Sequence, residues 1–470
     1  MNMINVRRLT VMTFLGAGML PGISAQGSLL QADTLKADML KEMKIPTQWD
    51  LQSCIDYAKE QNITIRKNRI TAAGTQIDVK TAKAALFPSL SFSTGHQVVN
   101  RPYQETSSRV SGSEIISSNS KTSYNGNYGL NASWTLYNGN KRLKTIQQEK
   151  LNNQIAELDV ATSENNIQES IAQVYIQILY AAESVRVNEN TLQVSIAQRD
   201  RGQELLNAGS IAKSDLAQLE AQVSTDRYQL VTAQATLEDY KLQLKQLLEL
   251  DGENEMNIFL PTLSDENVLA PLPAKRDVYI SALGLRPEIE ASKLNVEASE
   301  LGINIAKSSY FPTISLSAGI GTNHTSGSDF TFGEQVKNGW NNSIGLSVSV
   351  PIFNNRQTKS AVQKAKLQYE TSMLSLLDEQ KALYKTIESL WLDANSAQQR
   401  YAAANEKLKS TKISYELTSE QFNLGMKNTV ELLTEKNNLL QAQQEQLQAK
   451  YMAILNTQLL KFYQGDQLAL

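Results

Sequence analysis

One stretch of the chain, residues 127–140, alternates apolar residues with small polar ones. The apolar residues are Tyr128, Leu130, Ala132, Trp134 and Leu136. The residues that alternate with them are Asn127, Gly129, Asn131, Ser133 and Thr135. Because successive side chains of a β-strand point to opposite faces, the stretch predicts a strand with one apolar and one polar face. A strand of a soluble β-sandwich fits this pattern, and so does a tilted membrane strand that lines water.

The same pattern returns in the second half of the chain, over residues 343–352. Each of the two strands has an upstream partner, residues 89–93 and residues 313–321, and both partners follow a Phe-Pro pair. Equivalent residues lie 224 positions apart before the two hairpins and 216 positions apart after them, so the hairpin loops differ by eight residues. The chain is therefore predicted to contain an internal repeat, with one copy of the hairpin in each half.

The start of the chain and its composition restrict the class of protein. Two arginines, an apolar run and a small-residue cleavage site after Ala25 predict a signal peptide over residues 1–25, and hence export. The formal net charge of −3 gives no reason to expect nucleic acid as a partner. No later stretch reaches the ~18 apolar residues of a transmembrane helix, so a membrane-spanning part has to be a β-barrel. The single cysteine, Cys54, is expected to be a buried hydrophobic residue.

The rest of the chain is dominated by helical patterns. Helices are expected over residues 49–62, 63–86, 141–207 and 211–250 in the first copy, and over 286–309, 356–422 and 428–463 in the second. The two repeats span residues 49–250 and 278–463, with an unassigned lead at 26–48, a linker at 251–277 and a tail at 464–470. The Ser/Thr/Asn-rich residues 100–122 are expected to form a solvent-facing loop.

The helices after each hairpin carry a coiled-coil pattern. The seam of residues 211–250 is interrupted at Asp226 alone and consists of Leu216, Leu219, Val223, Leu230, Ala233, Leu237, Tyr240, Leu244 and Leu247. A period of 3.5 residues predicts left-handed coiled-coil packing. A helix over residues 141–207 would measure about 100 Å at ~1.5 Å per residue. These lengths predict a rod with strands at one end and tight turns at the other.

The strands also restrict the number of copies. Four strands with open edges cannot lie in lipid, because each unpaired backbone group costs several kcal/mol there. A closed membrane barrel has at least about eight strands, so the chain must oligomerise to close one. The residues predicted to face lipid are Leu130, Trp134, Leu136, Ile344, Leu346 and Val348.

The duplicated order of motifs resembles the TolC family of outer-membrane efflux proteins. The resemblance is carried by WDLQSCIDYAKEQN at residues 49–62, the Phe-Pro junctions at 87–88 and 311–312, SWTLYNGN, SVPIFNN, NAGSIAKSDL and NLGMKNTVEL. It implies a mixed α/β membrane protein of Gram-negative cells, a homotrimer whose twelve strands form one β-barrel in outer-membrane lipid. The barrel would continue as a long α-helical coiled-coil barrel across the periplasm. The resemblance also implies docking on a periplasmic adaptor (a membrane fusion protein) and an inner-membrane pump.

The resemblance further implies roles for residues at two turns between helices. Those that match adaptor-contacting turns are Gly209, Ser210, Gly425 and Met426, and those that match the periplasmic gate are Asp215, Lys427, Glu431 and Thr434. Glu431 falls at an acidic ring in the narrowest part of the tunnel, whereas Thr434 stands where a second acidic residue is often found. Lys427 can pair with Asp215 across helices or with Glu431 on its own helix. Helix capping explains the carboxylates equally well, and left-handed helix ends explain the glycines.

These features together predict a passive exit duct without catalytic residues, cofactor or metal site, whose cargo is a drug, a metal or a protein. The only histidines, His96 and His324, are expected at the surface near strand ends. One alternative is the outer-membrane duct of a type I protein secretion system. Another, from a different class, is a coiled-coil envelope scaffold or adaptor. An adaptor lacks four alternating strands, so the strand count favours the duct.

Overall fold

The computed structural model describes residues 46–468 apart from seven short gaps, which are 104–106, 112–113, 119–120, 252–255, 262–267, 327 and 329. The predicted signal peptide and almost all of the predicted lead therefore lie outside the described residues. The chain divides into the units Met1–Thr47 and Gln48–Leu470, and every element named below belongs to the second unit.

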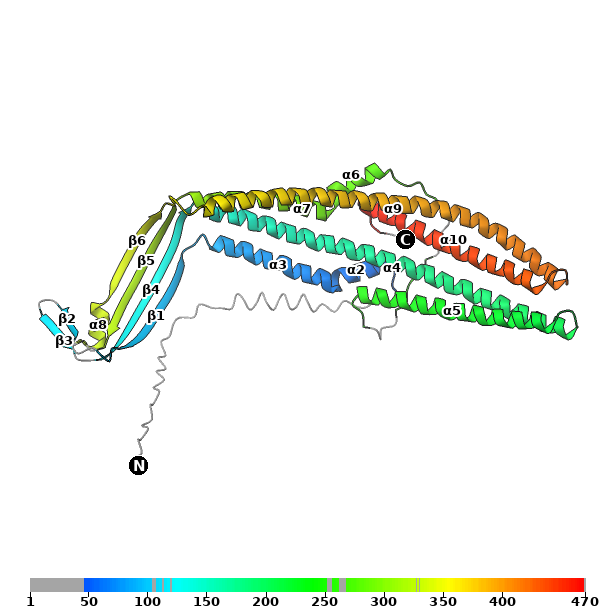
Figure 1. Ribbon diagram of the computed structural model, residues 1–470, viewed down its shortest axis with the longest axis horizontal. Coiled ribbons are helices and arrows are strands. Elements are labelled where there is room, and N and C mark those ends of the chain that lie inside the picture. Colours follow the sequence, from blue (N-terminus) through cyan, green and yellow to red (C-terminus); the bar gives the residue numbers. More distant parts are fainter. Residues whose placement is uncertain are drawn as a thin grey trace, which may run out of the picture. The chain divides into compact units, whose positions relative to one another are not determined.

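The elements occur in the same order in both halves of the chain (Figure 1). The first half contains α2 (Leu51–Gln61), α3 (Ile63–Ala84), β1 (Ser89–Asn100), β4 (Thr122–Asn138), α4 (Lys141–Asn207) and α5 (Lys213–Leu247). The second half contains α6 (Lys275–Leu285), α7 (Pro287–Lys307), a 3-10 turn (Ser308–Tyr310), β5 (Thr313–Thr325), β6 (Asn341–Ser349), α9 (Gln357–Asn423) and α10 (Thr429–Gln464). The two long helices α4 and α9 have the same length, 67 residues each.

Three parts of the chain differ from the sequence-based expectation. The prediction of a continuous loop over residues 100–122 was wrong, because β2 (Ser107–Ser111) and β3 (Glu114–Ser118) form a second hairpin inside it. Antiparallel pairing between adjacent segments satisfies their backbone groups without an apolar core. The connection between β5 and β6 contains a short helix, α8 (Phe332–Asn338). Helix α6 begins at Lys275, inside the predicted linker 251–277, directly after the last proline of that segment.

The four long strands form one antiparallel sheet in the order β1–β4–β5–β6. One row across the sheet consists of Leu90, Ala132, Ala318 and Ile344, and the adjacent row consists of Ser91, Asn131, Gly319 and Ser343. Trp134 and Leu346 both lie beside Leu316, in another apolar row. The alternation read from two stretches therefore continues across all four strands and gives the sheet one apolar face and one face of small polar residues.

A β-bulge interrupts the regular pairing where the sheet meets the helices. The register of β4 against β5 shifts between Thr135 and Tyr137, so Leu136 has no residue opposite it on β5. Two residues earlier, the Trp134 indole Nε1 donates a hydrogen bond to the Leu86 carbonyl oxygen at 2.7 Å. This bond joins β4 to the short segment that follows α3.

The helices beside the sheet repeat the order of its strands. Helix α3 leads into β1, β4 leads into α4, α7 leads into β5, and β6 leads into α9. Helix α4 packs against both α3 and α7, and α7 packs against α9 (Figure 1). At the other ends of the long helices, α5 packs on α4 and α10 packs on α9, while α10 also contacts α4. The second unit thus consists of a sheet and a helical layer whose members follow the same lateral order.

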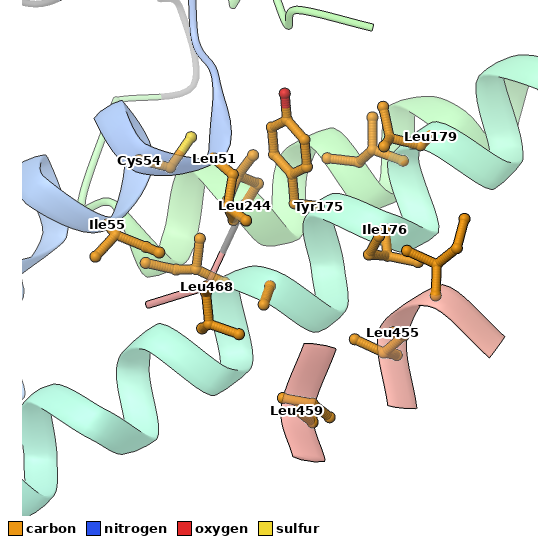
Figure 2. Packing of buried hydrophobic residues seen from close by; sticks show 14 of the residues in the cluster. Leu51, Cys54, Ile55, Tyr175, Ile176, Leu179, Leu244, Leu455, Leu459 and Leu468 are labelled. Carbon is orange, nitrogen blue, oxygen red and sulfur yellow. The ribbon is translucent and has the colours of Figure 1, made fainter. Parts of the chain in front are cut away.

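The largest hydrophobic cluster lies where α2, α4, α5 and α10 meet (Figure 2). Leu468 from the C-terminal segment belongs to the same cluster. Cys54 is fully buried in the same cluster, which confirms its expected role as a small hydrophobic residue. Burial raises the pKa of the Cys54 thiol to about 12, so this group stays uncharged.

The two faces of the sheet make a testable prediction for β6. Leu346→Lys places a charge on the apolar face, which the sequence predicts to face lipid, and a charge there would cost about 2–4 kcal/mol near the bilayer midplane. Ser347→Lys places the same charge on the polar face of the same strand. We expect the first variant to lower the yield of membrane-inserted protein and the second to leave it unchanged, as measured by immunoblotting of outer-membrane fractions. Equal yields would mean that the two faces are assigned wrongly.

Candidate functional site

The two turns between paired helices have the same backbone geometry. Gly209 and Gly425 adopt φ angles of +74° and +75°, which confirms the predicted left-handed helix ends. The Ser210 amide donates to the Leu205 carbonyl at 2.8 Å, and the Met426 amide makes the equivalent 2.8 Å bond. This six-residue closure is the Schellman arrangement, which satisfies carbonyl groups left free at a helix end.

Space around the two glycines is open. A Cβ atom added at either glycine would meet no atom within 4 Å. Only the positive φ angle therefore disfavours a residue with a side chain at these positions. Leu424 and Met426 are exposed beside the second glycine. Both turns therefore have open space at their glycines, and the second also presents exposed apolar side chains. Contact of Ser210 and Met426 with an adaptor stays a prediction.

The charged residues at the second turn pair locally, across the start of α10, because Lys427 precedes the N-cap residue Asn428 and is not part of the helix. The Lys427 ammonium group contacts the Glu431 carboxylate, and the same carboxylate accepts a 3.1 Å hydrogen bond from the Asn428 amide. The Asn428 side chain accepts a 2.9 Å bond from the Glu431 amide in return, which completes a capping box at the start of α10. The bond from Lys427 and the bond from Asn428 hold the pKa of Glu431 below its usual value.

Asp215 and Thr434 also bond locally. The Asp215 carboxylate accepts a 3.1 Å hydrogen bond from the Ala212 amide at the start of α5. The Thr434 hydroxyl donates to the Val430 carbonyl, one turn earlier on its own helix, at 2.8 Å. No ion pair joins Asp215 to Lys427 among the described residues of this single chain. Of the two expected partners of Lys427, the structure brings Glu431 to it.

A buried charged cluster that sequence analysis did not identify lies further along the same helices. The Lys436 ammonium group of α10 contacts the Asp226 carboxylate of α5 and the Ser195 hydroxyl of α4, and Ser195 also donates to Asp226. The three residues are only 3%, 1% and 2% exposed. Burial lowers the pKa of Lys436, although the Asp226 carboxylate acts in the opposite direction. This cluster joins the α4–α5 hairpin to α10.

A second buried cluster, around Arg286 at the start of α7, joins α4, α7 and α10. The Arg286 guanidinium donates to Glu169 of α4 at 2.9 Å and to Glu288 of α7 at 2.8 Å. It also lies 4.1 Å from the centre of the Tyr463 ring of α10. Burial raises the pKa of Glu169, and the neighbouring Arg286 opposes that shift.

Neither histidine belongs to a metal site in the part of the chain that the structure describes. His96 lies on β1 and His324 on β5, and no group of three or more metal-ligating side chains occurs among the described residues. Over the same residues, none of the helices is apolar for a length that would cross a bilayer.

The sequence profile of a known protein family matches both halves of the chain. The sequence profile described as "Outer membrane efflux protein" matches residues 54–249 and 278–465, which is well over half of the chain. The chain belongs to this family.

Individual relatives are distant in sequence. The outer membrane efflux protein BepC of Brucella suis is 24% identical over 294 residues, which make up 62% of this chain and 61% of BepC. Outer membrane protein TolC of Escherichia coli is 22% identical over 87% of this chain and 80% of TolC. Among solved structures, CusC has the same fold, with a TM-score of 0.75 and 18% identity over 91% of this chain and 96% of CusC.

The place of the protein in the cell follows from its family. Outer membrane efflux proteins are located in the outer membrane and extend into the periplasm, and this chain is one of them.

Sequence reasoning missed the Asp226 cluster for a definable reason. Asp226 is the one interruption of an otherwise apolar seam, so its position was visible as an anomaly. Its partner Lys436 lies 210 residues away on the other hairpin, where nothing in the local pattern marks it. A charged residue at a seam position of one helix is a signal to search the seams of the other helices for an opposite charge.

The Asp226 cluster makes a prediction about stability. Asp226→Leu leaves the Lys436 charge buried without a partner, which costs about 3–5 kcal/mol, whereas replacing both charges by apolar residues is often neutral. We expect Asp226→Leu to lower the midpoint of thermal unfolding of the detergent-solubilised protein, and Asp226→Leu with Lys436→Leu to recover it. Asp239→Leu, at an exposed position of α5, is the control. A double variant less stable than the single one would contradict this account.

Proposed function

We propose that three copies of the chain form a passive outer-membrane exit duct, which carries cargo from an inner-membrane pump and a periplasmic adaptor to the outside. The observation that carries the proposal is the pair of open edges in a sheet with one apolar and one polar face. Strands β1 and β6 each have only one neighbour in the sheet, and β6 is exposed along its whole length. Joining β6 of one copy to β1 of the next pairs both edges.

The number three is what the family resemblance implies, and the size of the pore favours it over two copies. Two copies would give eight strands, and an eight-stranded barrel is narrow enough for side chains to fill its interior. Three copies give twelve strands and leave room for a channel lined by the small polar face. A head-to-tail contact of this kind closes into a ring when its rotation permits. On this proposal the two halves of each chain are duplicated copies of one unit.

The outer helices support the same closure. Ile63, Ile70 and Ile77 lie seven residues apart on α3 and are all exposed, and Leu367 and Leu374 form an equivalent exposed pair on α9. Helices α3 and α9 flank the helical layer, as β1 and β6 flank the sheet. Apolar residues repeating every seven positions are typical of a coiled-coil interface. Contact between α3 and α9 of adjacent copies would close the helices into a tube.

The distribution of charge supports a duct with its selectivity at the periplasmic tip. The strands β1, β4, β5 and β6 contain no Asp, Glu, Lys or Arg. Glu431 would occur three times around one axis at the tip, with Lys427, Asp215 and Thr434 close to it as parts of the gate. The turns at Gly209 and Gly425 are the surface that we assign to the adaptor. Nothing in this arrangement needs a catalytic group or a cofactor.

The alternative function is a duct that secretes proteins, and one relative supports it. The alkaline protease secretion protein AprF of Pseudomonas aeruginosa is 22% identical over 64% of this chain. A protein-secretion duct and an efflux duct differ in the inner-membrane partner that they bind. Crosslinking in intact cells followed by identification of the captured inner-membrane protein separates the two.

The outer-helix seam predicts an effect on assembly. Ile70→Lys with Ile77→Lys adds two positive charges to the exposed apolar seam of α3 and should reduce the yield of detergent-stable oligomer, as measured by size-exclusion chromatography with light scattering. The control, Thr71→Lys with Asp78→Asn, makes the same change in net charge on the neighbouring flank of α3. If both double variants assemble alike, the seam does not lie between copies.

The tip predicts a change in ion selectivity. Glu431→Gln should move the reversal potential in planar bilayers toward zero under a KCl gradient, because it removes three negative charges from one constriction. Lys427→Gln should move the potential the other way, and Glu420→Gln on α9 is the control. Because the pKa of Glu431 is held low, the cation preference should persist in mild acid and disappear only as the pH falls through that lowered pKa. Unchanged potentials in both tip variants would exclude a charged constriction here.

A further inference from the structure

Aromatic rings form a continuous band across the end of the sheet that lies away from the long helices. Ring centres are 5.5 Å apart for His96 and Tyr128, 5.8 Å for His96 and Tyr124, 5.8 Å for Tyr124 and His324, and 5.0 Å for His324 and Phe332. The Tyr124 hydroxyl also lies 2.7 Å from the His96 Nδ1 atom. The band therefore links three strands to α8.

The band lies on the apolar face of the sheet. His96 and His324 are both opposite Gly126, on either side of β4. Side chains alternate along a strand, so His96 is on the same face as Leu90, and Gly126 is on the same face as Leu130. A Cβ atom added at Gly126 would lie 3.3 Å from the His96 ring and 3.4 Å from the Tyr128 hydroxyl, so these two side chains cover the space beside the glycine.

Helix α8 is fixed to β5 at this level. The Thr322 hydroxyl donates to the Val336 carbonyl at 2.8 Å, and the Thr325 amide donates to the Gln335 side chain at 2.9 Å. A capping box between Thr331 and Glu334 starts the helix. These bonds hold α8 in one position against the sheet.

Apolar side chains on and beside α8 nevertheless remain uncovered. Phe330, Phe332 and Trp340 are 50%, 55% and 57% exposed. Phe332 and Val336 are one helical turn apart, whereas Glu334 and Lys337 lie on the other side of α8. A short helix with aromatic residues on one side and charges on the other suits a membrane surface.

The distance between Trp134 and the band matches the thickness of a membrane. Ten residues of β4 separate Trp134 from Tyr124, which corresponds to ~33 Å along the strand at ~3.3 Å per residue. A strand tilt of ~40° reduces this to about 25 Å, the height of the lipid-facing apolar zone of outer-membrane barrels, which is bordered by aromatic residues. Trp134 lies at the helical end of that zone, so the band lies at its outer border.

We propose that α8, with Phe330, Phe332 and Trp340, is a lipid anchor that lies in the headgroup region of the outer leaflet and continues the aromatic band. The proposal rests on the proposed function, because it needs the apolar face of the sheet to meet lipid. The partner is a lipid surface: the rings lie among headgroups and upper acyl chains, and Lys337 points to the aqueous side.

Fluorophore labelling at single cysteines tests this assignment. The only native cysteine is removed as Cys54→Ala, and Phe332→Cys, Trp340→Cys, Lys337→Cys and Leu346→Cys are labelled with bimane. The labelled proteins are reconstituted into vesicles of phosphatidylethanolamine and phosphatidylglycerol. We expect quenching by aqueous iodide to be several-fold weaker at positions 332, 340 and 346 than at 337.

Each outcome has a distinct meaning. Strong iodide quenching at positions 332 and 340, with position 346 protected, would overturn the anchor and leave the duct intact. It would assign the α8 surface to water or to a protein outside the cell. Strong quenching at position 346 as well would overturn the proposed function itself. Protection at 332 and 340 together with exposure at 337 would establish the anchor.

Discussion

The unpaired edges of β1 and β6 are the constraint on which the rest of the structure depends. Backbone groups along an open edge cost several kcal/mol each in lipid, so a four-stranded sheet is not a stable membrane structure by itself. The helical layer has the same order as the sheet and has exposed apolar seams on its two outer members, α3 and α9. On the proposed assembly, one closing operation between copies would satisfy both layers at once.

The distribution of charge differs between the strands and the helices. The long strands contain no charged residue, so the part of the chain assigned to lipid and lumen carries no fixed charge on either face. Two buried ionic clusters, around Asp226 and Arg286, join helices that belong to different hairpins. The Lys427–Glu431 pair is exposed and spans the start of α10. The buried clusters thus join the hairpins to one another, whereas the exposed pair joins only neighbouring residues.

Features that depend on local pattern were predictable from the sequence. The bounds of α4 followed from an Asn-Gly pair before it and a glycine after it, and the left-handed glycines followed from the need to end a helix abruptly. Pairings that depend on distant partners were not predictable. The bulge at Leu136 arises from the register against β5, and the burial of Asp226 depends on Lys436 of another hairpin. Hairpin β2–β3 was missed because its two short strands lie in a Ser-rich stretch without a regular alternation of apolar and polar residues.

The mass of the detergent-solubilised, processed protein tests the central claim most directly. Native mass spectrometry of the outer-membrane fraction after gentle detergent extraction measures the number of chains per particle without any change to the sequence. Closure of twelve strands predicts particles of three chains and none of one or two. A stable single chain, or extraction from the membrane without detergent, would contradict the account, because the edges of β1 and β6 would then be compatible with their surroundings unpaired.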